Sequence, residues 1–172
     1  VTLGAAFFEH PKYISALASE TARHFARLVA APERVVMSFH GLPQRYVDRG
    51  DPYHAQCAAT ASLLREAMGW TEDFAPLAFQ SKFGPGRWLQ PSTEETLADL
   101  ARRGVKRVAV LTPGFVSDCI ETLEEIAIRA AETFIQNGGT TLTAVPCLND
   151  SDAMIDLLEA LVSLSAAVGS RQ

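Results

Sequence analysis

Short β-branched segments alternate with helical patterns along almost the whole chain, and this alternation limits the possible folds more than any other feature. The segments predicted to be strands are residues 34–39, 74–80, 107–111 and 142–146. The segments predicted to be helices are residues 12–30, 54–68, 92–104, 119–136 and 152–165. Strands that are joined by helices run in the same direction, so the sequence predicts a mainly parallel sheet of about four strands with helices on both faces. The expected fold class is an α/β three-layer αβα sandwich.

Length, charge and cysteine content argue against several classes of protein. With 172 residues, 48% of them hydrophobic, the chain is predicted to form a single domain over residues 1–172. Its net charge is −5 and its basic residues are scattered, which argues against a nucleic-acid partner. Cys57, Cys119 and Cys147 lie far apart without a Cys-x-x-Cys motif, which argues against a disulfide framework. We expect a cytoplasmic protein, with peripheral contact to a membrane left open.

His40 directly follows the first predicted strand, at the edge of the sheet where ligands usually bind. In doubly wound sheets this edge lies beyond the carboxyl ends of the strands, at the point where the strand order reverses. A neutral imidazole can accept a proton near pH 7 or bind a borderline metal such as Fe²⁺. A histidine that only hydrogen-bonds its own loop is the commoner alternative, and position alone does not decide between them.

Glu121 begins the helix that follows the third predicted strand, and it also has two interpretations. Asp118 and Glu121 have the spacing of a capping box, in which Asp118 would cap the helix and Glu121 would reach back to its N–H. Glu121, Glu124 and Glu125 would also form an acidic patch on the helix side opposite Ile120, Leu123, Ala127, Ala130 and Phe134. Such a patch is usually a solvated face, but beside a ligand site it is also a plausible cation path.

The segment at residues 81–91, SKFGPGRWLQP, places large apolar side chains in a loop rich in Gly and Pro. Its Trp88 could form a wall for a flat hydrophobic ligand. It could equally fold back as a lid on the core of the domain.

Four long blocks of this sequence resemble ferrochelatases, particularly the proteobacterial kind. They are SFHGLPQRYVDRGDPY (38–53), FQSKFGPGRWLQPSTEETL (79–97), GVKRVAVLTPGFVSDCIETLEEI (104–126) and PCLND (146–150). The similarity is collinear from about residue 11 to residue 160. Several blocks in one order are far more specific than a single motif, so the resemblance favours the functional interpretations of His40 and Glu121.

The resemblance implies two flavodoxin-like, chelatase-like domains with a porphyrin held between them. This sequence would be the carboxyl-terminal half, with the amino-terminal domain absent. The implied enzyme is a lyase that inserts Fe²⁺ into protoporphyrin IX, forming protohaem and releasing two protons in the last step of haem biosynthesis. Coproporphyrin is an open alternative to protoporphyrin. The isolated half is expected to be inactive or weak, and to self-associate through its exposed domain interface.

The resemblance also implies roles for individual residues. His40 and Glu121 would be catalytic and would bind the metal, with Glu125 relaying protons or Fe²⁺. Ser38, Pro43 and Trp88 would be the porphyrin-binding residues. Two positions depart from the pattern of some relatives, because Cys119 replaces a histidine and Arg129 replaces an acidic residue. No iron–sulfur cluster or other cofactor is predicted, since nothing after Cys147 could bind one.

Three rival interpretations stay open at this point. The chain could be a metal-dependent hydrolase, or a smaller single-domain cobalt or nickel chelatase, that uses His40 and Glu121. It could also be a non-catalytic domain that binds porphyrin weakly or merely folds.

Overall fold

The computed structural model of this protein describes residues 4 and 6–169. The described chain contains one parallel sheet with the order β2-β1-β3-β4. Its strands are β1 (Arg34–His40), β2 (Leu77–Gln80), β3 (Arg107–Leu111) and β4 (Thr141–Ala144). The strand order reverses between β1 and β3, so the predicted four-stranded parallel sheet and its switch point are confirmed.

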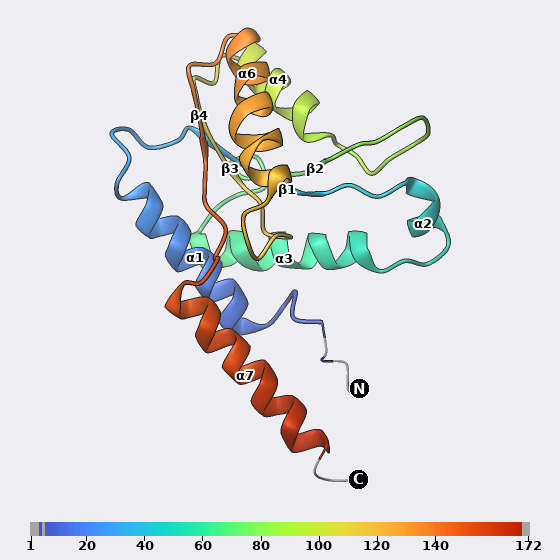
Figure 1. Ribbon diagram of the computed structural model, residues 1–172. Coiled ribbons are helices and arrows are strands. Elements are labelled where there is room, and N and C mark those ends of the chain that lie inside the picture. The colour runs from blue at the N-terminus through green and yellow to red at the C-terminus, as the bar shows by residue number, and fades with distance from the viewer. Residues whose placement is uncertain (1–3, 5, 170–172) are drawn as a thin grey trace.

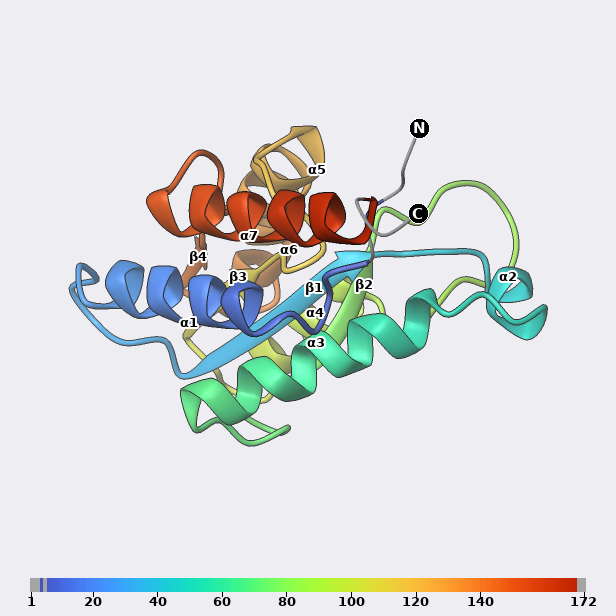
Figure 2. The same ribbon diagram turned by 90° about the horizontal axis from the view of Figure 1, so that it is seen from below.

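Helices cover both faces of the sheet, as the alternating pattern predicts (Figure 1). One face carries α1 (Pro11–Phe25), α3 (Tyr53–Met68) and α7 (Asp152–Gly169), with α1 between the other two (Figure 2). The other face carries α4 (Thr93–Arg102), the π-helix η1 (Glu125–Ala130) and α6 (Ala131–Gln136). Alternate residues of β1 enter the two cores because side chains alternate across a strand: Val35 and Met37 pack toward α1 and α3, and Val36 packs toward α4 and α6.

Three helical segments differ from the prediction. α1 ends at Phe25 instead of near residue 30, because Val29 is fully exposed and has no core to pack against. A short helix, α2 (Gln44–Asp48), lies between β1 and α3, where no helix is predicted from the sequence. The helix predicted over residues 119–136 is divided into α5 (Ile120–Leu123), η1 and α6. In η1 the Arg129 N–H bonds the carbonyl of Glu124 at 3.0 Å, five residues back, which is the hydrogen bond of a π-helix.

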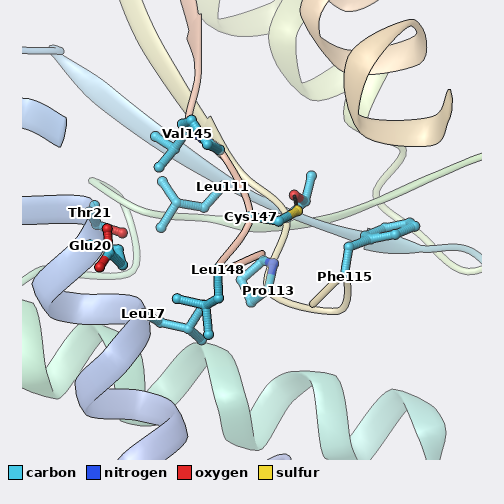
Figure 3. A pocket seen from close by; sticks show the side chains of 11 residues that line it. Leu17, Glu20, Thr21, Leu111, Pro113, Phe115, Val145, Cys147 and Leu148 are labelled. Carbon is cyan, nitrogen blue, oxygen red and sulfur yellow. Dashed lines mark hydrogen bonds between the residues drawn. The ribbon is translucent and has the colours of Figure 1, made fainter. Parts of the chain in front are cut away.

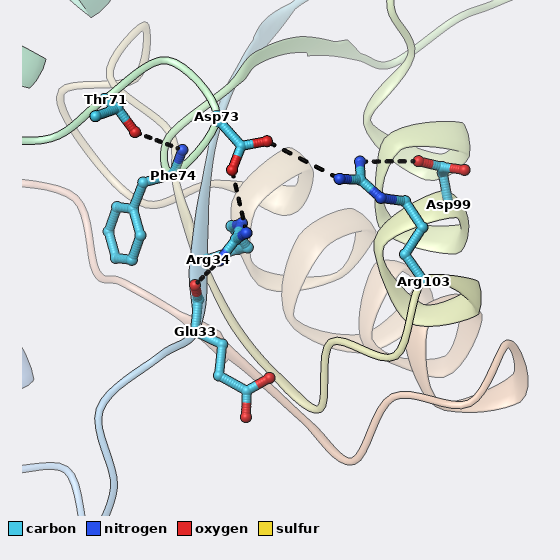
Figure 4. Close-up of polar contacts among 7 residues, drawn as sticks. All are labelled: Glu33, Arg34, Thr71, Asp73, Phe74, Asp99 and Arg103. Carbon is cyan, nitrogen blue, oxygen red and sulfur yellow. Dashed lines mark hydrogen bonds and ion pairs between the residues drawn. The ribbon is translucent and has the colours of Figure 1, made fainter.

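The charged residues at the amino-terminal edge of the sheet pair with one another (Figure 4). Asp73 accepts from Arg34 at 3.1 Å and lies 3.9 Å from Arg103, which in turn lies 3.5 Å from Asp99. These pairs are largely exposed, so each contributes little to stability. None of the helices in the described part of the chain could span a membrane.

Candidate active site

His40 is the last residue of β1 and stands at the carboxyl-terminal edge of the sheet. Its Nδ1 lies 2.7 Å from the carbonyl oxygen of Gly41, and its ring centroid lies 6.2 Å from that of Phe115. A carbonyl oxygen can only accept, so Nδ1 carries the proton in this contact. In the neutral imidazole the lone pair is then on Nε2, where it can accept a proton or bind a metal ion. The loop hydrogen bond and the functional role are therefore compatible in His40.

Glu121 lies in α5 and is not used to cap it, so the predicted Asp118–Glu121 capping box is wrong. The N-cap residue is Cys119, whose N–H donates to Thr122 Oγ1 at 3.0 Å. Because Thr122 fills the capping role, the Glu121 carboxylate is available for other contacts. The pKa of Glu121 is lowered, first by a hydrogen bond with the Cys119 side chain, then by its own backbone N–H and by the charge of His40. Glu121 thus lies at the same edge of the sheet as His40.

Glu125 is held against the end of β2. Its carboxylate accepts from the Ser81 N–H at 2.7 Å and from the Ser81 hydroxyl at 2.6 Å. Gln80 Nε2 approaches the same carboxylate at 3.5 Å. Ser81 has a φ of 63°, a left-handed conformation that turns its N–H toward this carboxylate. Glu125 therefore lies at the same edge of the sheet as His40, and its oxygens are already hydrogen-bonded to Ser81.

The predicted acidic patch is divided in the structure. Glu124 pairs with Arg129 at 2.8 Å, so one of its three carboxylates is neutralised. Nowhere in the described part of the chain do three or more His, Cys, Asp or Glu side chains gather so that they could hold a metal ion. His40, Glu121 and Glu125 do not form a ready three-ligand metal site in this chain.

Ser38, Pro43 and Trp88 occupy two different environments. Ser38 is fully buried, and its hydroxyl bonds Gln80 Oε1 and Thr93 Oγ1, each at 2.7 Å. It can act on a ligand only through those partners. Pro43 and Trp88 form an antiparallel bridge, and Trp88 is half-buried with its ring against Gly41. Leu89, which is 3% exposed, is the residue of this loop that enters the core, so the lid alternative applies to Leu89 and not to Trp88.

Three further residues at this edge were missed by the sequence reasoning. Tyr53 is held against the His40 backbone and hydrogen-bonds Cys57, and burial raises the pKa of its phenol. Gln80 and Ser81 connect the end of β2 to Glu121 and Glu125. The available signal was the polar pair Gln80-Ser81 at the end of an apolar strand, inside a block that resembles the family.

Two hollows lie near this edge, and neither is lined by His40, Glu121 or Trp88. A cavity of about 20 Å³ lies between α1 and the ends of β3 and β4, lined mainly by apolar side chains such as Leu17, Leu111 and Val145 (Figure 3). It has room for about one water molecule. An open groove of about 700 Å³ runs between α4 and the η1–α6 segment, lined by residues of mixed charge that include Glu125, Arg129 and Arg102. His40 and Trp88 are each half-buried, so both side chains reach the surface of the described chain.

The loops that follow β3 and β4 are fixed to each other by Asp118. Its carboxylate accepts from Asn149 Nδ2 at 2.7 Å, from Thr122 Oγ1 at 3.0 Å and from the Cys147 N–H at 3.3 Å. Partial burial acts to raise the pKa of Asp118, but these hydrogen bonds outweigh it and the pKa is lowered. Because Thr122 follows Glu121 directly, Asp118 also fixes the start of α5.

We predict that Asp118→Asn lowers the free energy of unfolding by about 1 kcal/mol at neutral pH, since it removes a charged hydrogen-bond acceptor. A lowered folded-state pKa stabilises the protein above the pKa of the unfolded carboxyl, and that contribution disappears as the pH falls through the folded-state value. Urea unfolding at pH 7 and about pH 3 should therefore show a deficit that shrinks in acid. An equal deficit at both pH values would contradict this account.

Comparisons with known proteins point to one family. A sequence model of the family described as Ferrochelatase matches residues 2–166. The curated Ferrochelatase of Nitrobacter hamburgensis is 54% identical over 156 residues, which cover 91% of this chain and 45% of that protein. The Ferrochelatase of Rhizobium meliloti is 53% identical, with 91% of this chain and 46% of the relative covered. The chain therefore spans about half the length of the curated relatives it matches.

One solved structure supports the fold. It is a multi-domain protein of Deinococcus radiodurans, described as having structural similarity to chelatases. The TM-score is 0.54 at 17% identity, with 89% of this chain and 29% of that chain covered. At this identity the likeness concerns the fold alone.

Proposed function

Since this chain belongs to the ferrochelatase family, we propose that it is the carboxyl-terminal domain of an enzyme that inserts Fe²⁺ into protoporphyrin IX. The products would be protohaem and two protons. The observation that carries the proposal is that His40, with its Nε2 lone pair available, and Glu121 lie at the same carboxyl-terminal edge of the sheet. Fe²⁺ is a substrate of this reaction, and the proposed chemistry requires no further cofactor in this chain.

The reaction exchanges two pyrrole N–H protons for one metal ion, so the site needs a proton acceptor and a metal carrier. We assign these two tasks to His40 and Glu121. A neutral imidazole can accept a pyrrole proton through Nε2, and a carboxylate beside it favours the imidazolium that results. Glu125 would pass protons or Fe²⁺ to this pair when its hydrogen bonds to Ser81 open.

The porphyrin would lie against the surface formed by Trp88 and Pro43, next to His40. Ser38 would act indirectly, because its buried hydroxyl reaches the site only through Gln80 and Thr93. This surface is open on its other side, and an open site cannot exclude water or hold a macrocycle in a bent shape. We propose that the polypeptide absent from this chain but present in its longer relatives supplies the second wall.

The outer face of α7 is the surface that we propose for contact with that polypeptide. Met154 and Leu157 of α7 are buried, whereas Ile155, Leu158 and Val162 are 53%, 42% and 68% exposed. A surface helix normally has one apolar stripe facing its own core, and this second stripe is turned to solvent. Exposed apolar stripes often mark interfaces, and the later turns of α7 extend past the start of α1 (Figures 1 and 2). In the absence of the other half, the same stripe would pair copies of this chain.

We predict that Leu158→Lys weakens binding of the separately expressed other half by about 10- to 100-fold, since a buried leucine contributes roughly 1.5–3 kcal/mol. Glu159→Lys is the matched control, because it also introduces a lysine, at an exposed, polar position of the same helix. Isothermal titration calorimetry gives both dissociation constants. Equal affinities for the two variants would exclude this face, and a purely monomeric mass at high micromolar concentration would exclude pairing of copies.

The experiment that tests the proposed function compares three samples in a metal-insertion assay. They are this chain alone, the non-matching half of the N. hamburgensis relative alone, and a fusion in which that half precedes this chain. We refer to the fusion as the completed protein. We expect zinc or anaerobic Fe²⁺ insertion into protoporphyrin IX by the completed protein, and little or none by either half. A completed protein that folds and binds porphyrin but inserts neither metal would overturn the proposal.

A further inference from the structure

The side chain of Gln80 connects the two elements that hold the proposed catalytic pair. Gln80 is the last residue of β2 and is 5% exposed. Its Oε1 accepts from the Ser38 hydroxyl at 2.7 Å, and its Nε2 donates to the backbone carbonyl of Glu121 at 2.8 Å. A carbonyl and a carboxylate only accept hydrogen bonds, so the amide nitrogen must face Glu121 and Glu125 and the amide oxygen must face Ser38. This fixes the orientation of the amide.

The main chain of Gln80 holds the other member of the pair. Its carbonyl oxygen accepts from the N–H of Gly41 at 2.8 Å, and Gln80 lies directly opposite His40 in the β1–β2 register. A Cβ added at Gly41 would lie 2.7 Å from the same carbonyl oxygen, so β1 and β2 approach closely just beyond His40. One residue thus bonds the chain next to His40 through its backbone and the chain at Glu121 through its side chain.

The buried hydrogen bonds around Gln80 form a directed series. If Ser38 donates to Gln80, its single hydroxyl proton is used, and Thr93 must be the donor in the Ser38–Thr93 contact of 2.7 Å. The series then runs from Thr93 of α4 through Ser38 and Gln80 to Glu121. Hydrogen bonds in such a series strengthen one another, and leaving one member unpaired in the interior carries a large penalty. The start of α5 is therefore tied to the interior of the sheet.

We propose that Gln80 is a positioning residue that sets the separation between the His40 imidazole and the carboxylates of Glu121 and Glu125. The inference rests on the proposed function, because that separation matters only if the pair acts on one ligand. A displacement of reacting groups by about 1 Å can lower a rate by roughly 100-fold. Gln80 itself touches neither metal nor porphyrin in this scheme.

The test uses Gln80→Leu, which keeps a similar volume but removes both hydrogen-bonding groups of the amide. In the completed protein we expect kcat to fall about 100-fold while KM for protoporphyrin changes less than about twofold, since the porphyrin wall at Trp88 is untouched. In the chain as it stands we expect amide hydrogen exchange in η1 to accelerate about tenfold, with β3 unchanged. Gln56→Leu, on α3 at the opposite face of the sheet from η1, is the matched control and should change neither readout.

A double variant separates positioning from simple loss of packing. In Gln80→Glu the new carboxylate would face the Glu121 carbonyl and the Glu125 carboxylate, so η1 exchange should accelerate. Adding Glu125→Gln places an amide opposite the carboxylate introduced at position 80, so that the donor and the acceptor of this contact change places. The rate of amide exchange in η1 should then return toward the wild-type rate.

Two results would overturn the inference. One is an unchanged kcat and unchanged η1 exchange in Gln80→Leu. The other is exchange that accelerates equally in β3 and η1 while kcat per folded molecule stays constant, which is the signature of a purely structural residue. If the wild-type completed protein inserts no metal, the proposed function fails, and the exchange measurements still decide whether Gln80 holds α5 and η1.

Discussion

Replacing His40 by alanine is expected to lower the rate of metal insertion by the completed protein about 10²- to 10⁴-fold, the usual contribution of a positioned general base. The structural reason is that the contact of Nδ1 with the Gly41 carbonyl leaves the lone pair on Nε2. Alanine removes that lone pair without disturbing the buried residues of β1, because His40 is half-buried at the end of the strand. Initial rates of zinc insertion into protoporphyrin IX measure the effect.

His24→Ala is the control for this prediction. His24 lies near the end of α1, where the neighbouring Phe25 packs against Trp70, away from the carboxyl ends of the strands. This variant should keep the wild-type rate per folded molecule. If His40→Ala retained more than about a tenth of the wild-type rate, the imidazole would not be the principal proton acceptor or metal carrier.

Replacing Phe134 by alanine is expected to lower the free energy of unfolding by about 3–5 kcal/mol, the range for large aromatic side chains removed from a core. Phe134 is fully buried on α6, in one core cluster with Ile126 and Ala130 of η1. A Cβ added at Gly139 would lie 2.3 Å from the Phe134 ring, so the ring fills its space up to the neighbouring backbone. Alanine would leave a cavity beneath the segment that carries Glu125.

The adjacent residue supplies the control for Phe134. Ile135 is 52% exposed, and Ile135→Ala should change stability by less than about 1 kcal/mol. Urea unfolding followed by circular dichroism gives both values. A loss below about 1.5 kcal/mol for Phe134→Ala would mean that the core between the sheet and α6 is not packed as described.

The sequence predicts the sheet well because each strand carries its own signal. The run Val35, Val36 and Met37 is apolar at every position, which is typical of a strand covered on both faces. The alternation of strands and helices then restricts the topology, since crossovers in parallel sheets follow few paths. The four strands and the switch beside His40 were predicted on these grounds.

The division of the helix after β3 could not be predicted, because a π-helix changes the period that sequence patterns assume. A regular helix over 119–136 predicts that Ile120 and Leu123 share a buried face with Phe134. Instead Ile120 and Leu123 are 71% and 58% exposed, and Ile126 is buried. The wider turns of η1 shift the following residues around the axis, and a pattern of period 3.6 does not detect that shift.

The candidate site was predicted in part. His40 and Glu121 were chosen through the family resemblance, since position alone left a loop histidine and a capping glutamate as alternatives. The burial of Ser38 and the contacts of Gln80 depend on residues 38, 80 and 121, which are distant in sequence and meet only after folding. Local patterns carry no information about such contacts, so Gln80 was overlooked.

The measurement that tests the central claim most directly is the simultaneous recording of proton release and zinc insertion by the completed protein with protoporphyrin IX, in weakly buffered solution with a pH indicator. We predict two protons released for each zinc inserted, with both signals lost together in His40→Ala. Tight porphyrin binding with neither proton release nor insertion would contradict the claim that the His40 edge of this domain carries out metal insertion.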